Sequence, residues 1–180
     1  MQKRVFQLFL KKEIQIGKAD KNFIKMNEDE LIKKALTSAK TIAMVGVSSI
    51  KKEESSNVKR RPSIIVMKYL QEFGYRVIPV NPFAVGKEIH GETVVEKLDD
   101  INIPIDIVDV FRPSKETPKI AKEAVKINAK VLWLQYGIQN KEAEEIVKPS
   151  NIFYVANKCI KQEYQKFFLK VNPVFPALKN

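Results

Sequence analysis

From Thr41 onward, short runs of β-branched and apolar residues alternate with segments that carry a helical period. The candidate strands are residues 41–47, 76–80, 105–110, 130–135 and 152–155. They are almost continuously apolar, which is typical of parallel strands covered by helices on both faces. The alternation itself is the pattern of βαβ units. We therefore expect an α/β domain of the Rossmann-like, doubly wound type, with a mainly parallel five-stranded sheet and helices on both faces.

The candidate helices fall between these strands. They are residues 63–73, 114–128 and 141–148, with a weaker pattern over 93–98 and a last helix at about 162–168. Another helix is expected before the first strand, because Asn27 can cap it and the acidic residues 28–30 suit the positive end of its dipole. No internal repeat or low-complexity linker divides the chain. We therefore predict one domain over residues 27–170, followed by a short tail over 171–180.

Residues 1–26 show neither a sustained helical period nor strand alternation. Within residues 1–27, seven basic residues stand against only two acidic ones. Two interpretations stay open: this segment is a flexible basic extension, or translation starts at Met26, directly before the helix cap.

The formal net charge of +11 favours a polyanionic partner: nucleic acid, a membrane surface or a phosphorylated cofactor. The chain has no basic motif interleaved with aromatic residues, which disfavours nucleic acid, and no apolar run of transmembrane length. Its single cysteine, Cys159, excludes an internal disulfide and fits a reducing compartment. We therefore expect a cytoplasmic protein, monomeric or homodimeric, with a phosphorylated small molecule as its partner.

In an open parallel sheet, ligands bind beyond the carboxyl ends of the strands. After the first strand, Gly46 would let backbone approach a phosphate, with Val47 and Ser48 beside it. The next helix begins at Pro62 and Ser63, directly after Arg61, and its first backbone amides favour an anion. The alternative interpretation of the glycine and serines is an ordinary tight turn.

The second strand is followed by Asn81, Pro82 and Lys87. An acidic residue here and a G-x-G-x-x-G pattern would favour NAD, and the sequence has neither. The later strands are followed by further candidates: Phe111 and Arg112 after the third, and Gln135 and Gly137 after the fourth. The alternative for Phe111 is a core position, and for Arg112 a surface charge.

The span from Thr41 to about Phe168 resembles the stand-alone bacterial CoA-binding domain family, which is similar in fold to the nucleotide domain of the succinyl-CoA synthetase α subunit. The segments that carry the resemblance are residues 42–48, 61–63, 66–70, 74–82, 86–87, 109–112 and 132–135. Two features depart from the family pattern. The loop between Ser49 and Arg61 is longer than usual, and the chain reads Lys158-Cys159-Ile160 where the family commonly has Arg-Cys-Pro.

The resemblance implies that coenzyme A, free or acylated, binds along this edge. Residues 46–48 and 61–63 would line its pyrophosphate, and Asn81, Pro82 and Lys87 would border the adenosine. Phe111 and Arg112 would lie beside the base and the pantetheine arm, and Gln135 and Gly137 would close the rim. The basic residues of these loops suit a ligand that carries several negative charges.

Catalytic machinery is not evident in the sequence. Cys159 has two interpretations, a small buried hydrophobe or a thiol that meets the ligand, with Lys158 favouring its thiolate. His90, the only histidine, is expected on a surface loop. Asp106 and Asp109 should point to opposite faces of a strand and form no acid/base pair. We predict a non-catalytic binding module, with an NAD(P)- or nucleotide-sensing regulator and an enzyme acting on CoA thioesters as alternatives.

Overall fold

The computed structural model describes residues 26–48 and 61–170. Five strands form one sheet in the order β2-β1-β5-β6-β7, and every neighbouring pair is parallel. The strands are β1 (Thr41–Val45), β2 (Arg76–Val80), β5 (Ile107–Val110), β6 (Val131–Leu134) and β7 (Phe153–Val155). The predicted five-stranded parallel sheet is therefore confirmed, with each strand slightly shorter than expected or equal in length. The basic extension and the tail predicted at the two ends of the chain lie outside the described residues.

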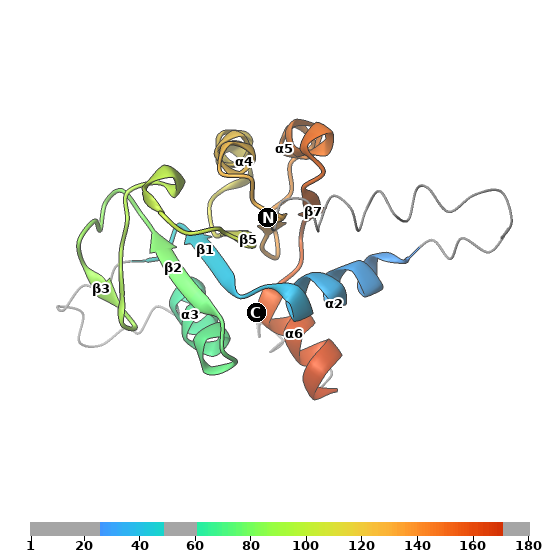
Figure 1. The fold of residues 1–180 in the computed structure, drawn as a ribbon, viewed down its shortest axis with the longest axis horizontal. Coiled ribbons are helices and arrows are strands. Elements are labelled where there is room, and N and C mark those ends of the chain that lie inside the picture. The colour runs from blue at the N-terminus through green and yellow to red at the C-terminus, as the bar shows by residue number, and fades with distance from the viewer. Residues whose placement is uncertain (1–25, 49–60, 171–180) are drawn as a thin grey trace, which may run out of the picture.

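Helices cover both faces of the sheet (Figure 1). On one side lie α2 (Glu28–Ser38), α3 (Pro62–Glu72) and α6 (Ile160–Tyr164), which a π-helical turn (Gln165–Leu169) continues. On the other side lie α4 (Thr117–Lys126) and α5 (Lys141–Val147). Short 3₁₀ turns occupy Leu98–Asp100, Ser114–Glu116 and Lys148–Ser150. Among these described helices, none has the length and apolarity needed to cross a membrane.

The core has two halves because successive side chains of a strand point to opposite faces. Met44 and Trp133 are fully buried against α2, α3 and α6, whereas Ala43 and Leu132 are fully buried against α4 and α5. The strands are apolar at both alternating positions for this reason, as the sequence indicated.

The start of α2 is held by a capping box. Asn27 Oδ1 accepts from the Glu30 N–H at 2.9 Å, and the Asn27 N–H donates to Glu30 Oε2 at 3.0 Å. The acidic first turn of this helix also complements its dipole. The helix start predicted at Asn27 is thus confirmed.

The helix predicted over residues 93–98 is wrong. A small hairpin occupies this region, with β3 (Glu88–Ile89) antiparallel to β4 (Glu92–Thr93) around a turn in which His90 and Gly91 both have positive φ. Val95 then forms a bridge with Val80, and its N–H bonds to the Pro79 carbonyl at 3.0 Å. Pairing with the edge of the main sheet therefore outweighs the weak helical pattern of this stretch.

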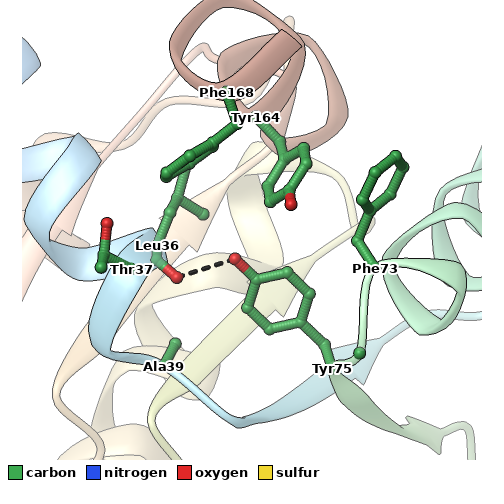
Figure 2. A pocket seen from close by; sticks show the side chains of 8 residues that line it. Leu36, Thr37, Ala39, Phe73, Tyr75, Tyr164 and Phe168 are labelled. Atoms are coloured by element: carbon green, nitrogen blue, oxygen red, sulfur yellow. Dashed lines mark hydrogen bonds between the residues drawn. The ribbon is translucent and has the colours of Figure 1, made fainter.

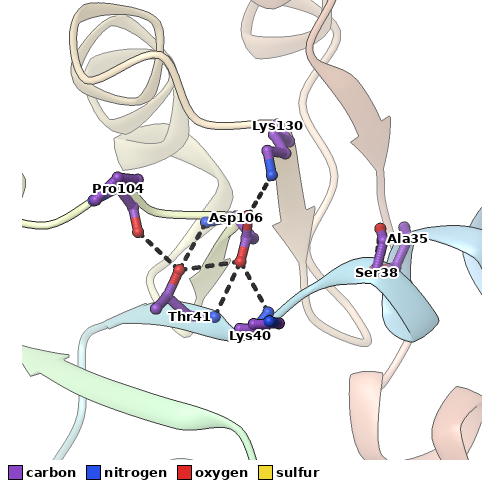
Figure 3. A network of polar contacts seen from close by, with 7 residues as sticks. All are labelled: Ala35, Ser38, Lys40, Thr41, Pro104, Asp106 and Lys130. Atoms are coloured by element: carbon purple, nitrogen blue, oxygen red, sulfur yellow. Dashed lines mark hydrogen bonds and ion pairs between the residues drawn. The ribbon is translucent and has the colours of Figure 1, made fainter. Parts of the chain in front are cut away.

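Asp106 connects three strands at the amino edge of the sheet (Figure 3). Its Oδ2 accepts from the Lys40 N–H at 2.8 Å and from the Thr41 N–H at 3.1 Å, and its Oδ1 accepts from Lys130 Nζ at 2.6 Å. Burial by itself would raise the pKa of Asp106, but the bonds from Lys130 and the two amides outweigh it and lower that pKa. The carboxylate therefore links the starts of β1, β5 and β6.

Replacing this carboxylate should weaken the sheet in a pH-dependent way. We expect Asp106→Asn to lower the free energy of unfolding by about 2 kcal/mol near pH 7, because bonds from a cation and two amides are lost or weakened. The folded pKa is lowered, so the stabilisation is present above the unfolded pKa and disappears as the pH falls through the folded value. Urea unfolding at pH 7 and pH 3 measures this; an equal difference at both values would contradict it. Asp99→Asn, at an exposed pair with Lys126, is the control.

Candidate ligand site at the carboxyl edge of the sheet

All five strands run in the same direction, so their carboxyl ends lie along one edge. The structure brings the predicted segments to this edge, namely residues 46–48, 61–63, 81–87, 111–112 and 135–137. After β1 the chain first adds β2 on one side and later returns to place β5 on the other. The strand order thus reverses between β1 and β5, and ligands of open α/β sheets bind beside such a point.

Gly46 makes the turn at this reversal and lies against Arg112. Its φ is +90°, and a Cβ placed there would be 2.6 Å from Arg112 Cδ and 2.8 Å from the Phe111 carbonyl oxygen. Its N–H donates to the Val80 carbonyl at 2.9 Å. The loops after β1 and β5 therefore approach so closely that a larger residue at position 46 would clash with backbone.

The energetic effect of the close packing at Gly46 can be measured apart from the effect of its positive φ. Gly74 has nearly the same φ, +88°, but nothing lies within 4 Å of its would-be Cβ. We expect Gly74→Ala to cost about 1 kcal/mol of unfolding free energy from backbone strain, and Gly46→Ala to cost about 1–3 kcal/mol more because the added methyl overlaps its neighbours. Chemical denaturation of both variants measures this, and equal losses would contradict the packing argument.

The turn after β1 is bonded to the start of α3. The Ser48 N–H donates to Ser63 Oγ at 3.1 Å, and Ser63 is only 3% exposed. Arg61 is the N-cap residue of α3, Pro62 is its first residue, and no acidic residue lies in its first turn. The positive end of the α3 dipole therefore lies beside Ser48. The long loop between Ser49 and Arg61 contains four further basic residues, Lys51, Lys52, Lys59 and Arg60, and residues 49–60 lie outside the described residues.

Asn81 holds the end of β2 against the turn after β1. Its Nδ2 donates to the Val47 carbonyl at 2.7 Å, while its Oδ1 accepts from the Phe83 N–H at 2.9 Å. Pro82 and Lys87 are exposed on the loop that follows. Asn81 therefore already has a structural role here, and its predicted position beside the adenosine stays a prediction.

Arg112 is not the free surface charge of its simplest interpretation, whereas Phe111 partly fits its alternative as a core residue. Arg112 is fixed rather than free in solvent, because Nε donates to Glu116 Oε2 at 2.8 Å and Nη2 donates to Glu116 Oε1 at 3.1 Å. Phe111 packs partly against the α3 side of the core. At the reversal point, the Arg112 side chain and the Phe111 carbonyl both lie next to Gly46, which places the arginine at the candidate site.

The sequence interpretation missed a buried polar pair beneath this edge. Gln135 is only 4% exposed, and its Nε2 donates to Asp109 Oδ1 at 2.7 Å. Asp109 itself is completely buried in β5, and burial raises its pKa to about 7, although the Gln135 bond and the Val110 N–H oppose the rise. One sequence signal could have found it: an acidic residue inside an otherwise apolar strand. Asp106, by contrast, lies in the network at the opposite edge, and the absence of an acid/base pair between the two aspartates stays a prediction.

The region after β7 completes the edge. Gly137 donates its N–H to Asn157 Oδ1 at 2.7 Å, which joins the loops after β6 and β7.

Cys159 is partly buried against the core. Burial raises the pKa of its thiol and the nearby Asp109 adds to the rise, although the amides of Gln162 and Lys161 oppose it. Because desolvation is the largest of these effects, the thiolate of Cys159 is disfavoured, and its interpretation as a small buried hydrophobe is the better one. His90 is exposed in the β3–β4 turn, as predicted, and the described residues contain no metal-binding cluster.

Asp109 should make stability depend on pH with a sign opposite to that of Asp106. Its folded pKa is raised, so the stability it contributes is present below the unfolded pKa, near 4, and is lost as the pH rises towards 7. Asp109→Asn removes the ionisation. We therefore expect this variant to gain stability relative to wild type between pH 4.5 and pH 8, by about 1–3 kcal/mol. Urea unfolding of both proteins at pH 4.5 and at pH 8 measures the gain. The same difference in unfolding free energy between variant and wild type at both pH values would contradict the prediction.

A separate hollow of about 260 Å³ lies near the amino edge (Figure 2). It is lined by Leu36, Thr37, Ala39, Phe73, Gly74, Tyr75, Tyr164 and Phe168. Tyr75 donates its hydroxyl to the Leu36 carbonyl at 2.7 Å. Ala39 and Tyr75 come just before β1 and β2, so this aromatic hollow lies at the end of the sheet opposite Gly46. None of the side chains that line it carries a positive charge that could bind a phosphate.

A parallel sheet with a glycine turn at its reversal point, and with polar loops along one edge, defines a Rossmann-like α/β domain. Residues 40–165 match the CoA binding domain family, and the chain belongs to that family. The resemblance noted from the sequence is thereby confirmed.

Relatives extend over most of the domain. The uncharacterised protein YneT of Bacillus subtilis (strain 168) is 38% identical over 130 residues, which cover 72% of this chain and 89% of that protein. A solved Thermus thermophilus structure is 38% identical, with a TM-score of 0.70, and covers 79% of this chain and 100% of its own. A hypothetical protein from Pyrococcus horikoshii OT3 is 34% identical, with a TM-score of 0.68, and covers 84% of this chain and 99% of its own.

Proposed function

We propose that the carboxyl edge of the sheet binds coenzyme A or an acyl-CoA, and that the domain is a binding module without catalytic machinery of its own. The observation that carries this proposal is the arrangement at the reversal point. The Gly46 turn, the start of α3 and the Arg112 guanidinium lie together there, in a chain that belongs to the CoA binding domain family. In this arrangement backbone amides, a helix dipole and a cation can all act on a pyrophosphate.

Each predicted contact has a physical basis in the described residues. Gly46, Val47 and Ser48 would present backbone to the pyrophosphate, and Arg61, Pro62 and Ser63 would present the start of α3. Lys87 is exposed on the loop after β2, where it can reach a phosphorylated ribose. Arg112 is 39% exposed, so it can turn from Glu116 to a phosphate of the ligand. A ligand with several negative charges gains from all of these groups together.

The end of β2 favours coenzyme A over NAD. A dinucleotide site of the usual kind holds the ribose diol with a carboxylate at this position. Here the residue is Asn81, and both ends of its amide are engaged by Val47 and Phe83. An amide held in this way offers no anionic acceptor to a ribose diol.

A binding role without catalysis is supported by the environments of His90 and Cys159, two side chains of types that act as base or nucleophile in enzymes. His90 lies in the exposed hairpin turn beyond β2 and not among the strand-end loops of the site. Burial raises the pKa of Cys159, which disfavours the reactive thiolate. These observations support a module that binds its ligand without transforming it.

Calorimetric titration with CoA, acetyl-CoA, NAD and NADP tests the proposal, when each series is measured at one stated salt concentration and then repeated at a higher one. We expect saturable binding of CoA or acetyl-CoA that weakens as salt rises. Arg112→Ala should weaken this binding about tenfold, because a charge-assisted hydrogen bond to phosphate is lost.

Arg76→Ala is the matched control for Arg112. Arg76 also forms a two-pronged pair with a glutamate, Glu92, but it stands at the amino end of β2. We expect this variant to bind CoA like the wild type. Binding of NAD or NADP without CoA would overturn the choice of ligand, and equal losses in the two arginine variants would overturn the location of the site.

A further inference from the structure

Asp109 has one oxygen without a hydrogen-bond donor. Its Oδ1 accepts from Gln135 Nε2, but Oδ2 has no partner among the described residues, although the side chain is fully buried. Leaving a buried acceptor unpaired is costly, and such groups in native proteins call for an explanation. The unpaired oxygen belongs to the central strand of the sheet, one residue before its carboxyl end.

The surroundings of this oxygen connect it to the candidate site. Asp109 pairs in register with Met44 and Trp133, and Phe111 follows it by two residues on the same face. Gln135 follows β6, and Cys159 after β7 is within electrostatic reach of the Asp109 carboxyl. Residues from β5, from the end of β6 and from the loop after β7 thus lie around the Asp109 carboxyl.

The strand order determines what part of the ligand would meet this group. If the pyrophosphate lies at the end of β1 and the adenosine at the end of β2, the pantetheine arm must run the other way, over β5 and β6. Neighbouring strands are about 4.8 Å apart, so the end of β6 is roughly 10 Å from that of β1. The arm is long enough to cover this distance, and its amide groups carry N–H donors.

We propose that Asp109 Oδ2 is the acceptor for an amide N–H of the pantetheine arm, with Gln135 holding the carboxyl in place. This inference rests on the proposed function. The arm enters the edge beside Phe111, whose ring is only partly buried, and the buried acceptor becomes paired when the arm is seated. Asp109 then distinguishes a ligand that has the arm from a nucleotide that lacks it, since a site with a buried polar group rejects ligands that leave this group unpaired.

The test compares CoA and acetyl-CoA, which share the arm, with ADP, which has the pyrophosphate and no arm. Asp109→Asn places an amide where the carboxyl was, and thus replaces the acceptor with a donor when the Gln135 bond is kept. We expect calorimetry at pH 8, above the Asp109 pKa of about 7, to show at least a tenfold loss in affinity for CoA and acetyl-CoA and an unchanged affinity for ADP. Asp106→Asn, the same substitution at the opposite edge, should leave all three affinities unchanged.

ADP binding by Asp109→Asn also reports whether this variant is folded. If it is not, Gln135→Met keeps the size of the side chain and removes the donor that orients Asp109, and it should lower the affinity for CoA but not for ADP. Equal losses for CoA and ADP, or no loss for either, would overturn the role of Asp109. A loss for CoA but not acetyl-CoA would also overturn it, because the thiol and not an amide would then be the donor. Failure of the wild type to bind CoA would instead overturn the proposed function itself.

Discussion

The parallel pairing of β1 with both β2 and β5 is the constraint on which the rest of the domain depends. It makes β1 an inner strand, so its side chains are covered on both faces, and Ile42, Ala43 and Met44 are all fully buried. The same pairing brings the loops after β1 and β5 into contact, where Arg112 lies against Gly46. The core and the candidate site therefore have a common origin in one strand arrangement.

The two edges of the sheet use buried carboxyl groups in opposite ways. At the amino edge, Asp106 is surrounded by donors, and its charge is stabilised by Lys130 and by backbone amides. Near the carboxyl edge, one oxygen of Asp109 accepts from Gln135, the other has no geometric hydrogen bond among the described residues, and burial raises the pKa of the carboxyl to about 7. The first arrangement joins strands, whereas the second leaves an acceptor unused by the fold. A satisfied network stabilises a structure, whereas a buried polar group that the fold leaves unsatisfied calls for a separate explanation.

Much of the fold could be predicted from the sequence because it depends on local patterns. Asn27 and the acidic turn after it indicated the start of α2, and apolar runs located all five strands to within two residues at each end. The prediction over residues 93–98 was wrong because the Val80–Val95 bridge is a contact with a distant strand edge, which local helical spacing does not reveal. At the candidate site, the sequence indicated which loops follow the strands. It did not reveal that Asn81 and Arg112 are already bonded to Val47 and Glu116.

The sequence by itself determined the class of fold, the number and direction of the strands, and the edge at which polar loops would gather, because these follow from residue periodicity and from the general geometry of βαβ units. Only the tertiary structure decided that Gly46 lies against Phe111 and Arg112, that Gln135 turns inward to Asp109, and that burial raises the pKa of Cys159. These features join residues that are 26 to 66 positions apart in the chain or depend on burial between packed elements. Contacts of that kind arise only when the strands have assembled, since the energy of a polar group depends on the groups that surround it once water has been excluded.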